Sequence, residues 1–211
     1  MGRPEVLAAL AGAAERGGAV GIRANGPENL VAICAAVSVP VIGIYKVVTP
    51  GSEVYITPTF AEAQQVFSAV TPPPAMIAVD ATFRPRPDGS DFRTLLKRIQ
   101  TEMGVLVMAD ISTYEEGVAA AEAGADIVAT TLSGYTTETA AKKATGEPDL
   151  ELVRQLSQTL SVPVICEGRV HSPELARAAL ECGAWAVVVG TAITAIDWVT
   201  RRYVEQIMER G

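Results

Sequence analysis

Short apolar runs alternate with amphipathic, alanine-rich segments along almost the whole chain. The apolar runs are rich in Val and Ile and are bounded by Gly, Pro or polar residues, which predicts strands. Between them, apolar residues recur at helical spacing. Near-continuous apolar strands that alternate with helices favour a parallel sheet covered on its faces. The predicted strands are residues 19–24, 39–46, 76–82, 105–111, 126–131, 162–168 and 186–190.

Two features support a repeated strand–helix unit. The hexapeptide SVPVIG at residues 38–43 recurs as SVPVIC at 161–166, and Ser172 precedes a Pro-Glu pair, as at a typical helix start. Only seven strands are visible, whereas a (β/α)8 barrel needs eight, and residues 4–16 already have a helical pattern. The pattern therefore leaves two architectures, an open doubly wound sheet or an α/β barrel that lacks its first strand.

Length and composition narrow the class of protein. The 211 residues suit one domain covering residues 1–211, and a hydrophobic share of 49% with a mean hydropathy of +0.26 indicates a well-buried globule. A formal charge of -7 and the absence of a basic run exclude nucleic acid as the expected partner. No apolar run is long enough for a membrane span. The odd cysteine count, without metal or redox spacing, favours a reducing cytoplasm.

Ionisable residues close five of the predicted strands. They are Arg23, Lys46, Asp80, Asp110 and Glu167. Ligands bind at the carboxyl ends of parallel strands, so this distribution predicts a site at that edge. Lys46 is the most unusual of the five, because burying an ammonium at the end of an apolar strand is costly unless the group is paired or loses its proton.

Side-chain alternation predicts which of these residues meet. If Lys46 points into a barrel, Ile44 points the same way, and if Glu167 points inward, so does Ile165. Lys46 and Glu167 are then expected to share one cavity. Cys166 would face the covering helices, where packing is a better explanation than a role as nucleophile.

Metal binding and histidine chemistry are weaker interpretations. Asp80, Asp110 and Glu167 would be possible ligands for a divalent cation, but the neighbouring cations compete for the same carboxylates, so no metal is expected. His171 is the only histidine and lies just before a predicted helix, where a surface position is expected. A histidine-based triad is therefore excluded as the working hypothesis.

Two glycine-containing loops follow the last two strands. Gly168 and Arg169 come after one strand, and Gly190 and Thr191 come after the next. Phosphate sites in many barrels are built from the last two such loops, because glycine lets backbone amides approach an anion and arginine adds charge. The sequence thus predicts a phosphate site at these loops.

Eight blocks of the chain together form a pattern that resembles the bacterial N-acetylmannosamine-6-phosphate 2-epimerases. The resemblance spans about residues 4 to 194 and implies a (β/α)8 barrel and an isomerase of amino-sugar and sialic acid breakdown. The blocks are GGAVGIRANG (17–26), PVIGIYK (40–46), VYITPT (54–59), DAT with RPRPDG (80–89), MADIST (108–113), TTLSGYT (130–136), EGRVHSPE (167–174) and AVVVGTAIT (186–194).

The resemblance implies a mechanism. Lys46 falls on the family's catalytic lysine and Glu167 on its catalytic glutamate. N-acetylmannosamine 6-phosphate and N-acetylglucosamine 6-phosphate would interconvert by removal and return of the C2 proton after ring opening, without a cofactor. As a base, Lys46 would need a pKa lowered toward ~7–8, which burial and Arg23 would favour and Glu167 would oppose. Glu167 would assist ring opening or move a proton at the oxygen.

The resemblance also suggests how the phosphorylated N-acetylhexosamine is held. Arg23 and Asp110 match substrate-contacting positions, and Asp80 and Thr131, which close neighbouring strands, are expected to join them. The loops of Gly168–Arg169 and Gly190–Thr191 match the region that holds the sugar phosphate.

Three departures from the family pattern stand out. The family usually begins with a further strand that this sequence lacks. Either the start codon is misplaced or the barrel has seven strands. Residues 48–50 are Val-Thr-Pro where an acid or lysine and then a tyrosine commonly precede the proline, and Ala195 replaces a frequent arginine. Two other interpretations stay open, a Schiff-base aldolase acting through Lys46 and a non-catalytic sugar-phosphate-binding paralogue.

The last segment, residues 196–211, has the pattern of an amphipathic helix. Packing on the barrel is the first expectation. An apolar face containing Trp198 and Tyr203 would equally join two subunits, and a homodimer is expected because it is the commonest closed assembly.

Overall fold

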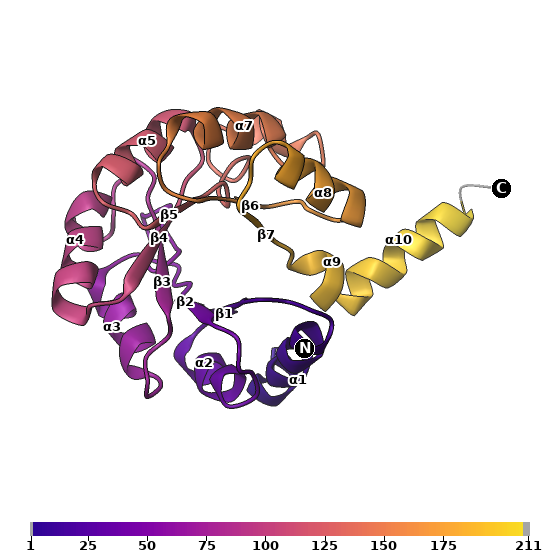
Figure 1. Ribbon diagram of the computed structural model, residues 1–211, viewed down its shortest axis with the longest axis horizontal. Coiled ribbons are helices and arrows are strands. Elements are labelled where there is room, and N and C mark those ends of the chain that lie inside the picture. Colours follow the sequence, from indigo (N-terminus) through magenta and orange to yellow (C-terminus); the bar gives the residue numbers. More distant parts are fainter. Residues whose placement is uncertain (1, 209–211) are drawn as a thin grey trace.

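Seven parallel strands form one sheet in the computed structural model, which describes residues 2–208 (Figure 1). All seven predicted strands are present, each shorter than predicted at one or both ends. Their bounds are β1 (Ile22–Asn25), β2 (Val41–Ile44), β3 (Met76–Asp80), β4 (Leu106–Asp110), β5 (Ile127–Ala129), β6 (Val164–Glu167) and β7 (Ala186–Val188).

Helices lie outside the curved sheet and connect successive strands (Figure 1). Two of them, α3 and α5, begin with a complete capping box, formed by Thr59 with Glu62 and by Thr113 with Glu116, and Ser172 caps α8 as predicted. No helix within residues 2–208 has the length and apolar character needed to cross a membrane. The helices are α1 (Pro4–Arg16), α2 (Pro27–Cys34), α3 (Phe60–Ser68), α4 (Phe92–Met103), α5 (Tyr114–Glu122), α6 (Ala140–Lys143), α7 (Leu150–Thr159), α8 (Pro173–Glu181), α9 (Thr191–Thr194) and α10 (Ile196–Met208).

The strand order decides between the two predicted architectures. The order is β1-β2-β3-β4-β5-β6-β7, so each strand pairs with its neighbour in the sequence. A doubly wound sheet reverses direction at a switch point, whereas a barrel adds strands in sequence. Among the described residues β1 pairs only with β2 and β7 only with β6, which leaves the barrel open at that point. The barrel-type fold without its usual first strand is confirmed.

Side chains alternate between the barrel interior and the helical layer, as predicted. Ile44 and Ile165 belong to the interior apolar cluster, whereas Val79 and Val128 pack against the helices. A Cβ on Gly43 would lie 2.5 Å from a Val66 methyl of α3, which places that position on the helical side. The strand bodies therefore form a packed core, and only their carboxyl ends are free to carry a site.

The predicted strand 39–46 ends earlier than expected, at Ile44, and Lys46 lies beyond it. There the chain turns back on itself, so that Lys46 pairs in antiparallel fashion with Ile56, and the lysine side chain is exposed. The expected burial of the Lys46 ammonium is wrong. The reason is the backbone pairing, which carries Lys46 past the packed part of the strand to the rim of the barrel.

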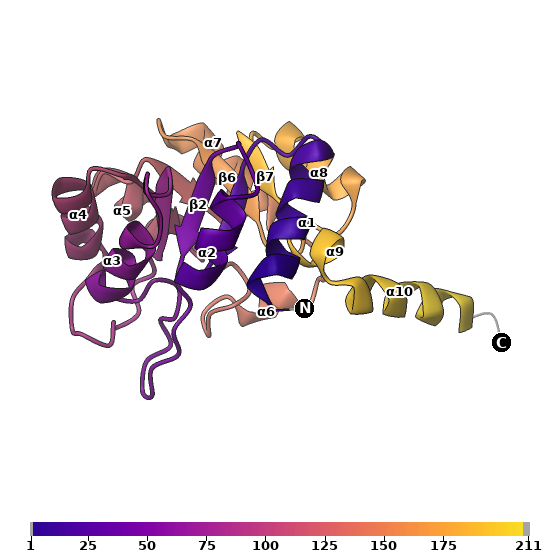
Figure 2. The same ribbon diagram turned by 90° about the horizontal axis from the view of Figure 1, so that it is seen from below.

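The expectation that the last helix packs on the barrel is also wrong. Helix α10 continues from α9 and extends away from the body of the molecule (Figures 1 and 2). Amphipathic spacing indicates an apolar face but does not say which surface covers it. The last three residues of the predicted helix lie outside the described residues. Exposed apolar residues along α10 are Ile196, Tyr203, Val204, Ile207 and Met208.

Candidate active site

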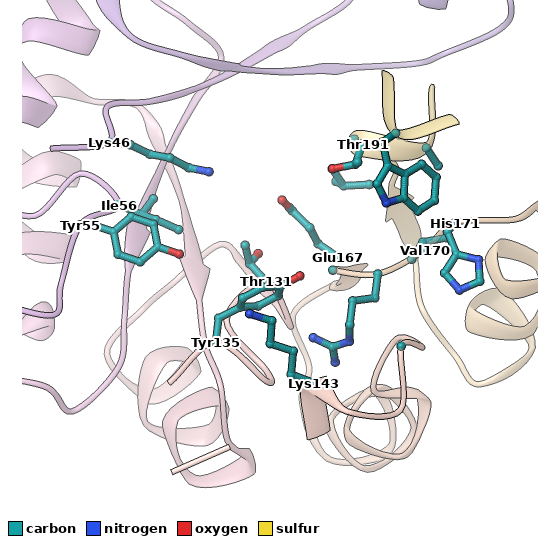
Figure 3. Close-up of a pocket in the computed structure, with 17 residues that line it drawn as sticks. Lys46, Tyr55, Ile56, Thr131, Tyr135, Lys143, Glu167, Val170, His171 and Thr191 are labelled. Carbon is teal, nitrogen blue, oxygen red and sulfur yellow. The ribbon is translucent and has the colours of Figure 1, made fainter. Parts of the chain in front are cut away.

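A cavity of about 640 Å³ opens at the carboxyl ends of the strands. Lys46 and Glu167 both line it, as do Thr131 and the loops that follow β6 and β7 (Figure 3). Figure 3 shows the Lys46 ammonium and the Glu167 carboxylate pointing into the cavity from facing sides. The prediction that these two residues share one cavity is thus confirmed by the coordinates.

Arg23 contacts two of the lining residues, Glu167 and Thr131, and its side chain is almost fully buried. Its Nη1 donates to Glu167 Oε2 at 2.7 Å and to Asp110 Oδ1 at 2.9 Å, while Nη2 is paired with the other Asp110 oxygen. Thr131 Oγ1 donates to Asp110 Oδ1 at 2.6 Å. One guanidinium therefore joins the ends of β1, β4 and β6, and four of the predicted residues form a single network.

Burial sets the charge properties of this network. Desolvation raises the pKa of Glu167, and the Asp110 charge adds to it, while Arg23 and Lys46 act in the opposite direction without cancelling the rise. For Arg23, burial disfavours the charge, but the Asp110 and Glu167 carboxylates outweigh it and raise the pKa of the guanidinium. Glu167 is therefore better suited to exchange protons near neutral pH than an ordinary glutamate.

Three predicted site residues, Arg23, Asp80 and Asp110, are not among the residues that line the cavity, and Asp80 also lies outside the network around Arg23. Its Oδ2 accepts from Arg84 at 2.7 Å, and its Oδ1 accepts from the amide and hydroxyl of Thr82. The backbone of Ile56 lies over the end of β3, since the Asp80 amide donates to the Ile56 carbonyl at 2.9 Å. Asp80 is fully buried as a result, and its geometry indicates a role in holding loops.

The two predicted phosphate loops do lie in the cavity wall. Gly168 has a φ of 100° and Arg169 a φ of 57°, so two consecutive residues occupy the left-handed region. Arg169 donates from Nη1 to the Ser133 carbonyl and from Nε to the Glu147 carbonyl, so its side chain ties the loop that follows β5 to the one that follows β6. Gly190 lines the cavity, and a Cβ there would meet nothing within 4 Å.

Several lining residues were not among the predicted site residues, although Tyr55 and Tyr135 stand in blocks of the family pattern. Tyr55, Tyr135 and Lys143 contribute to the cavity wall (Figure 3). Trp198 lines the cavity as well. His171 is half-buried and lines it too, with its ring tilted against Trp198 at a centroid distance of 6.5 Å. Its Nδ1 is buried without a hydrogen-bond partner among the described residues. Tyr55, Tyr135 and His171 come from loops, Lys143 ends α6 and Trp198 belongs to α10, and the apolar pattern does not determine where these segments lie.

Two other chemistries find little support in the geometry. Cys166 faces the helices in an apolar cluster, and burial raises the pKa of its thiol to about 11, which is unfavourable for a nucleophile. Within residues 2–208 no three His, Cys, Asp or Glu side chains converge in a way that would hold a metal ion. The carboxylates at the strand ends instead form ion pairs with arginines, Asp80 with Arg84 and Asp110 with Arg23.

The parallel barrel and the acid–base groups at its mouth define a (β/α)-barrel enzyme. Residues 7–209 match the family model described as "Putative N-acetylmannosamine-6-phosphate epimerase". The chain belongs to this epimerase family, as its sequence blocks had indicated.

Individual relatives agree with the family match. A protein of Synechococcus elongatus named "Putative N-acetylmannosamine-6-phosphate 2-epimerase" is 47% identical over 99% of this chain and 88% of its own length. A protein of the same name from Caldanaerobacter subterraneus is 49% identical over 98% of this chain and 85% of its own length. The solved structure of the N-acetylmannosamine-6-phosphate 2-epimerase from Clostridium perfringens superimposes with a TM-score of 0.90 at 41% identity, covering 97% of this chain and 86% of that one.

Proposed function

We propose that this chain is an isomerase that interconverts N-acetylmannosamine 6-phosphate and N-acetylglucosamine 6-phosphate, in the breakdown of amino sugars such as sialic acid. The observation that carries the proposal is the cavity shared by Lys46 and Glu167, in a chain of the epimerase family. At about 640 Å³ the cavity falls in the size range of small-molecule sites and accommodates a hexose phosphate.

Lys46 is proposed as the group that removes the C2 proton. Ring opening exposes the C1 aldehyde, and the C–H bond at C2 then breaks. The proton goes to Nζ of Lys46, while the electron pair moves to form the C1–C2 enolate with negative charge on the C1 oxygen. The side chain is exposed in the open cavity, so the bound sugar must cover it and exclude water before the C2 proton is removed. The Lys46 ammonium then returns the proton to the opposite face of C2 after the enolate has turned in the cavity, which inverts C2 and regenerates the neutral amine.

Glu167 is proposed as the second proton carrier. Its Oε2 accepts from Arg23, which fixes the carboxyl group, and burial raises its pKa toward the range in which it both takes and gives protons. From the wall facing Lys46, it would protonate and deprotonate the sugar oxygens during ring opening and closure. Arg23 holds this carboxyl group and is itself held by Asp110, while Thr131 lines the cavity and would contact the sugar.

The phosphate is proposed to bind at the loops of Gly168–Arg169 and Gly190–Thr191. The cavity lining carries Lys46, Lys143 and Arg169 as cations against Glu167 as the acid, so its local charge is positive in an otherwise acidic protein. A local positive field of this kind attracts and retains a phosphorylated sugar. The substrate would then lie with its phosphate at the β6 and β7 loops and its C1–C2 end toward Lys46.

Solvent exchange at C2 tests the proposed reaction directly. We expect deuterium from D2O to appear at C2 of N-acetylmannosamine 6-phosphate. Signals of N-acetylglucosamine 6-phosphate should then appear in the NMR spectrum. Lys46→Ala is expected to slow exchange by roughly 10²- to 10⁴-fold, the usual contribution of a positioned acid–base group. A wild-type protein that binds the sugar phosphate without any exchange would leave only the non-catalytic alternative.

The aldolase alternative makes a different prediction. A Schiff base on Lys46 would be trapped by borohydride in the presence of substrate, giving a permanent increase in mass. We expect no such adduct, because C2 deprotonation needs no covalent bond to the enzyme. A trapped adduct on Lys46 would replace the epimerase mechanism by an imine mechanism.

A homodimer is proposed from the course of α10. The helix extends away from the barrel, and its exposed apolar residues form a surface that a single described chain leaves uncovered (Figure 2). A second copy would cover such a surface with matching chemistry, as closed two-fold assemblies do. Light scattering after size exclusion is expected to give twice the chain mass of 22.1 kDa, whereas a monomer at micromolar concentration would contradict the assignment.

The cytoplasm is the proposed location. Cys34, Cys166 and Cys182 are all free thiols in the fold, which suits a reducing compartment. Fractionation of the source cells with an antibody against the chain tests this, and recovery outside the cytoplasm would contradict it.

A further inference from the structure

The segment between β2 and α3 places one phenol beside the proposed base. After Lys46 the chain runs out and returns, with the Val47 amide donating to the Tyr55 carbonyl at 2.9 Å and Lys46 pairing with Ile56. Tyr55 is half-buried and lines the same cavity. Figure 3 shows its hydroxyl pointing into the cavity from the same side as the Lys46 ammonium.

The return segment is held firmly at its end. Thr57 is fully buried and has a φ of 44°, a left-handed conformation that is uncommon for a β-branched residue. Its amide donates to the Tyr45 carbonyl at 2.8 Å, and its hydroxyl donates to the Ala78 carbonyl at 2.7 Å. Strained residues that are fixed in this way cluster at functional sites. Thr57 therefore sets the position of Tyr55 relative to Lys46.

The proposed reaction needs a hydrogen-bond donor at the C1 oxygen, where negative charge develops when C2 loses its proton. Arg23 is poorly placed for this task, because both of its terminal nitrogens already donate to the carboxylates of Asp110 and Glu167. The Thr131 hydroxyl likewise donates to Asp110. The phenol of Tyr55 has no hydrogen-bond partner among the described residues and is free for a ligand.

Resting on the proposed epimerase function, we propose that Tyr55 is a catalytic residue that donates a hydrogen bond to the C1 oxygen of the ring-opened sugar while Lys46 removes the C2 proton. The phenol keeps its own proton throughout, so the charge on the enolate is stabilised without a further proton transfer. Burial raises the pKa of the Tyr55 phenol above its ordinary value, and the carboxylates of Asp80 and Asp110 add to this against Arg84, so the group stays protonated at working pH.

Tyr55→Phe tests the assignment, because it removes the hydroxyl and keeps the ring. We expect kcat for epimerisation to fall by roughly 10²-fold while KM changes by less than about 2-fold, as for the loss of one donor that acts in the transition state. Deuterium exchange at C2 should slow by the same factor, since the same step is affected. The control is Tyr45→Phe, ten residues earlier, whose side chain packs against the outer apolar cluster.

Each outcome separates this assignment from the underlying function. Wild-type activity together with an unchanged kcat in Tyr55→Phe would overturn the role of Tyr55 and leave the epimerase proposal intact. A rise in KM alone would also overturn it, since the hydroxyl would then serve binding only. Absence of exchange in the wild type would instead reject the epimerase function. Tyr55→Phe must have the same unfolding midpoint as the wild type. We expect this result because phenylalanine keeps the aromatic ring.

Discussion

Arg23 and Glu167 lie 144 positions apart in the chain and are joined by an ion pair of 2.7 Å between Nη1 and Oε2. The same guanidinium also pairs with Asp110, so one buried cation serves two carboxylates, and one of them, Glu167, lines the cavity. This arrangement links structure to chemistry, because the residue that fixes the proposed proton carrier also neutralises the buried acidic charge around it. Loss of Arg23 should therefore affect folding and activity together.

Replacing Arg23 by Met is expected to lower the free energy of unfolding by about 3–5 kcal/mol, since it leaves two buried carboxylates without their cation. Arg23→Lys should lower the free energy of unfolding by less, because lysine keeps the charge, although it lacks the planar guanidinium that reaches both carboxylates. Urea denaturation followed by circular dichroism measures the change. Arg3→Met, which breaks an exposed pair with Glu5, serves as the control and should leave the midpoint unaltered. Equal midpoints for Arg23→Met and wild type would contradict the network.

Glu167→Gln is expected to abolish activity and to change the pH dependence of stability. The folded chain raises the pKa of Glu167, so between the ordinary glutamate value and the raised value the unfolded chain ionises first. The native state then holds more protons, and the free energy of unfolding falls as pH rises through this window. Glutamine does not ionise, so the variant lacks this fall in the free energy of unfolding. Between pH 4 and 8, the melting temperature of the variant should rise relative to that of the wild type as pH increases. A difference in melting temperature that stays constant over this range would contradict the assignment.

Much of the fold followed from the apolar pattern, because strand bodies such as those at residues 76–80 and 107–110 are buried on both sides and leave a continuous hydrophobic signal. The alternation of side chains along β2 and β6 was equally informative. It placed Lys46 and Glu167 on the cavity side and Cys166 among the helices, and the structure bears out both placements.

The rest depended on backbone pairing that local sequence does not encode. Tyr55 reaches the cavity only because the chain folds back against Lys46, and Asp80 leaves it because the same segment covers the end of β3. Both follow from contacts between positions about ten to thirty residues apart, outside any strand or helix period. The exposed course of α10 had no signal either, since an amphipathic pattern does not identify its partner surface.

Lys143 is expected to contribute to substrate binding. Its ammonium lies 5.6 Å from the centre of the Tyr135 ring and lines the cavity, without a carboxylate partner among the described residues. Lys143→Gln should raise KM for the sugar phosphate by roughly 2- to 5-fold and leave kcat unchanged, as for one exposed charge pair. Lys142→Gln is the matched control, because Lys142 is paired with Asp149 at 2.6 Å and does not line the cavity. A KM effect of equal size in both variants would show that only overall charge matters.

Gly190 tests the position of the phosphate. Its backbone has a φ of -110°, so a side chain causes no left-handed strain, and a Cβ would meet nothing within 4 Å. Gly190→Ala should therefore leave the melting temperature unaltered. If the phosphate approaches the backbone here, the added methyl group occupies part of its space, and inhibition by inorganic phosphate should weaken by roughly 10-fold, equivalent to about 1.4 kcal/mol. The phosphate inhibition constant, measured beside the melting temperature, checks both expectations. An unchanged inhibition constant for phosphate would show that the phosphate does not bind at the loop after β7.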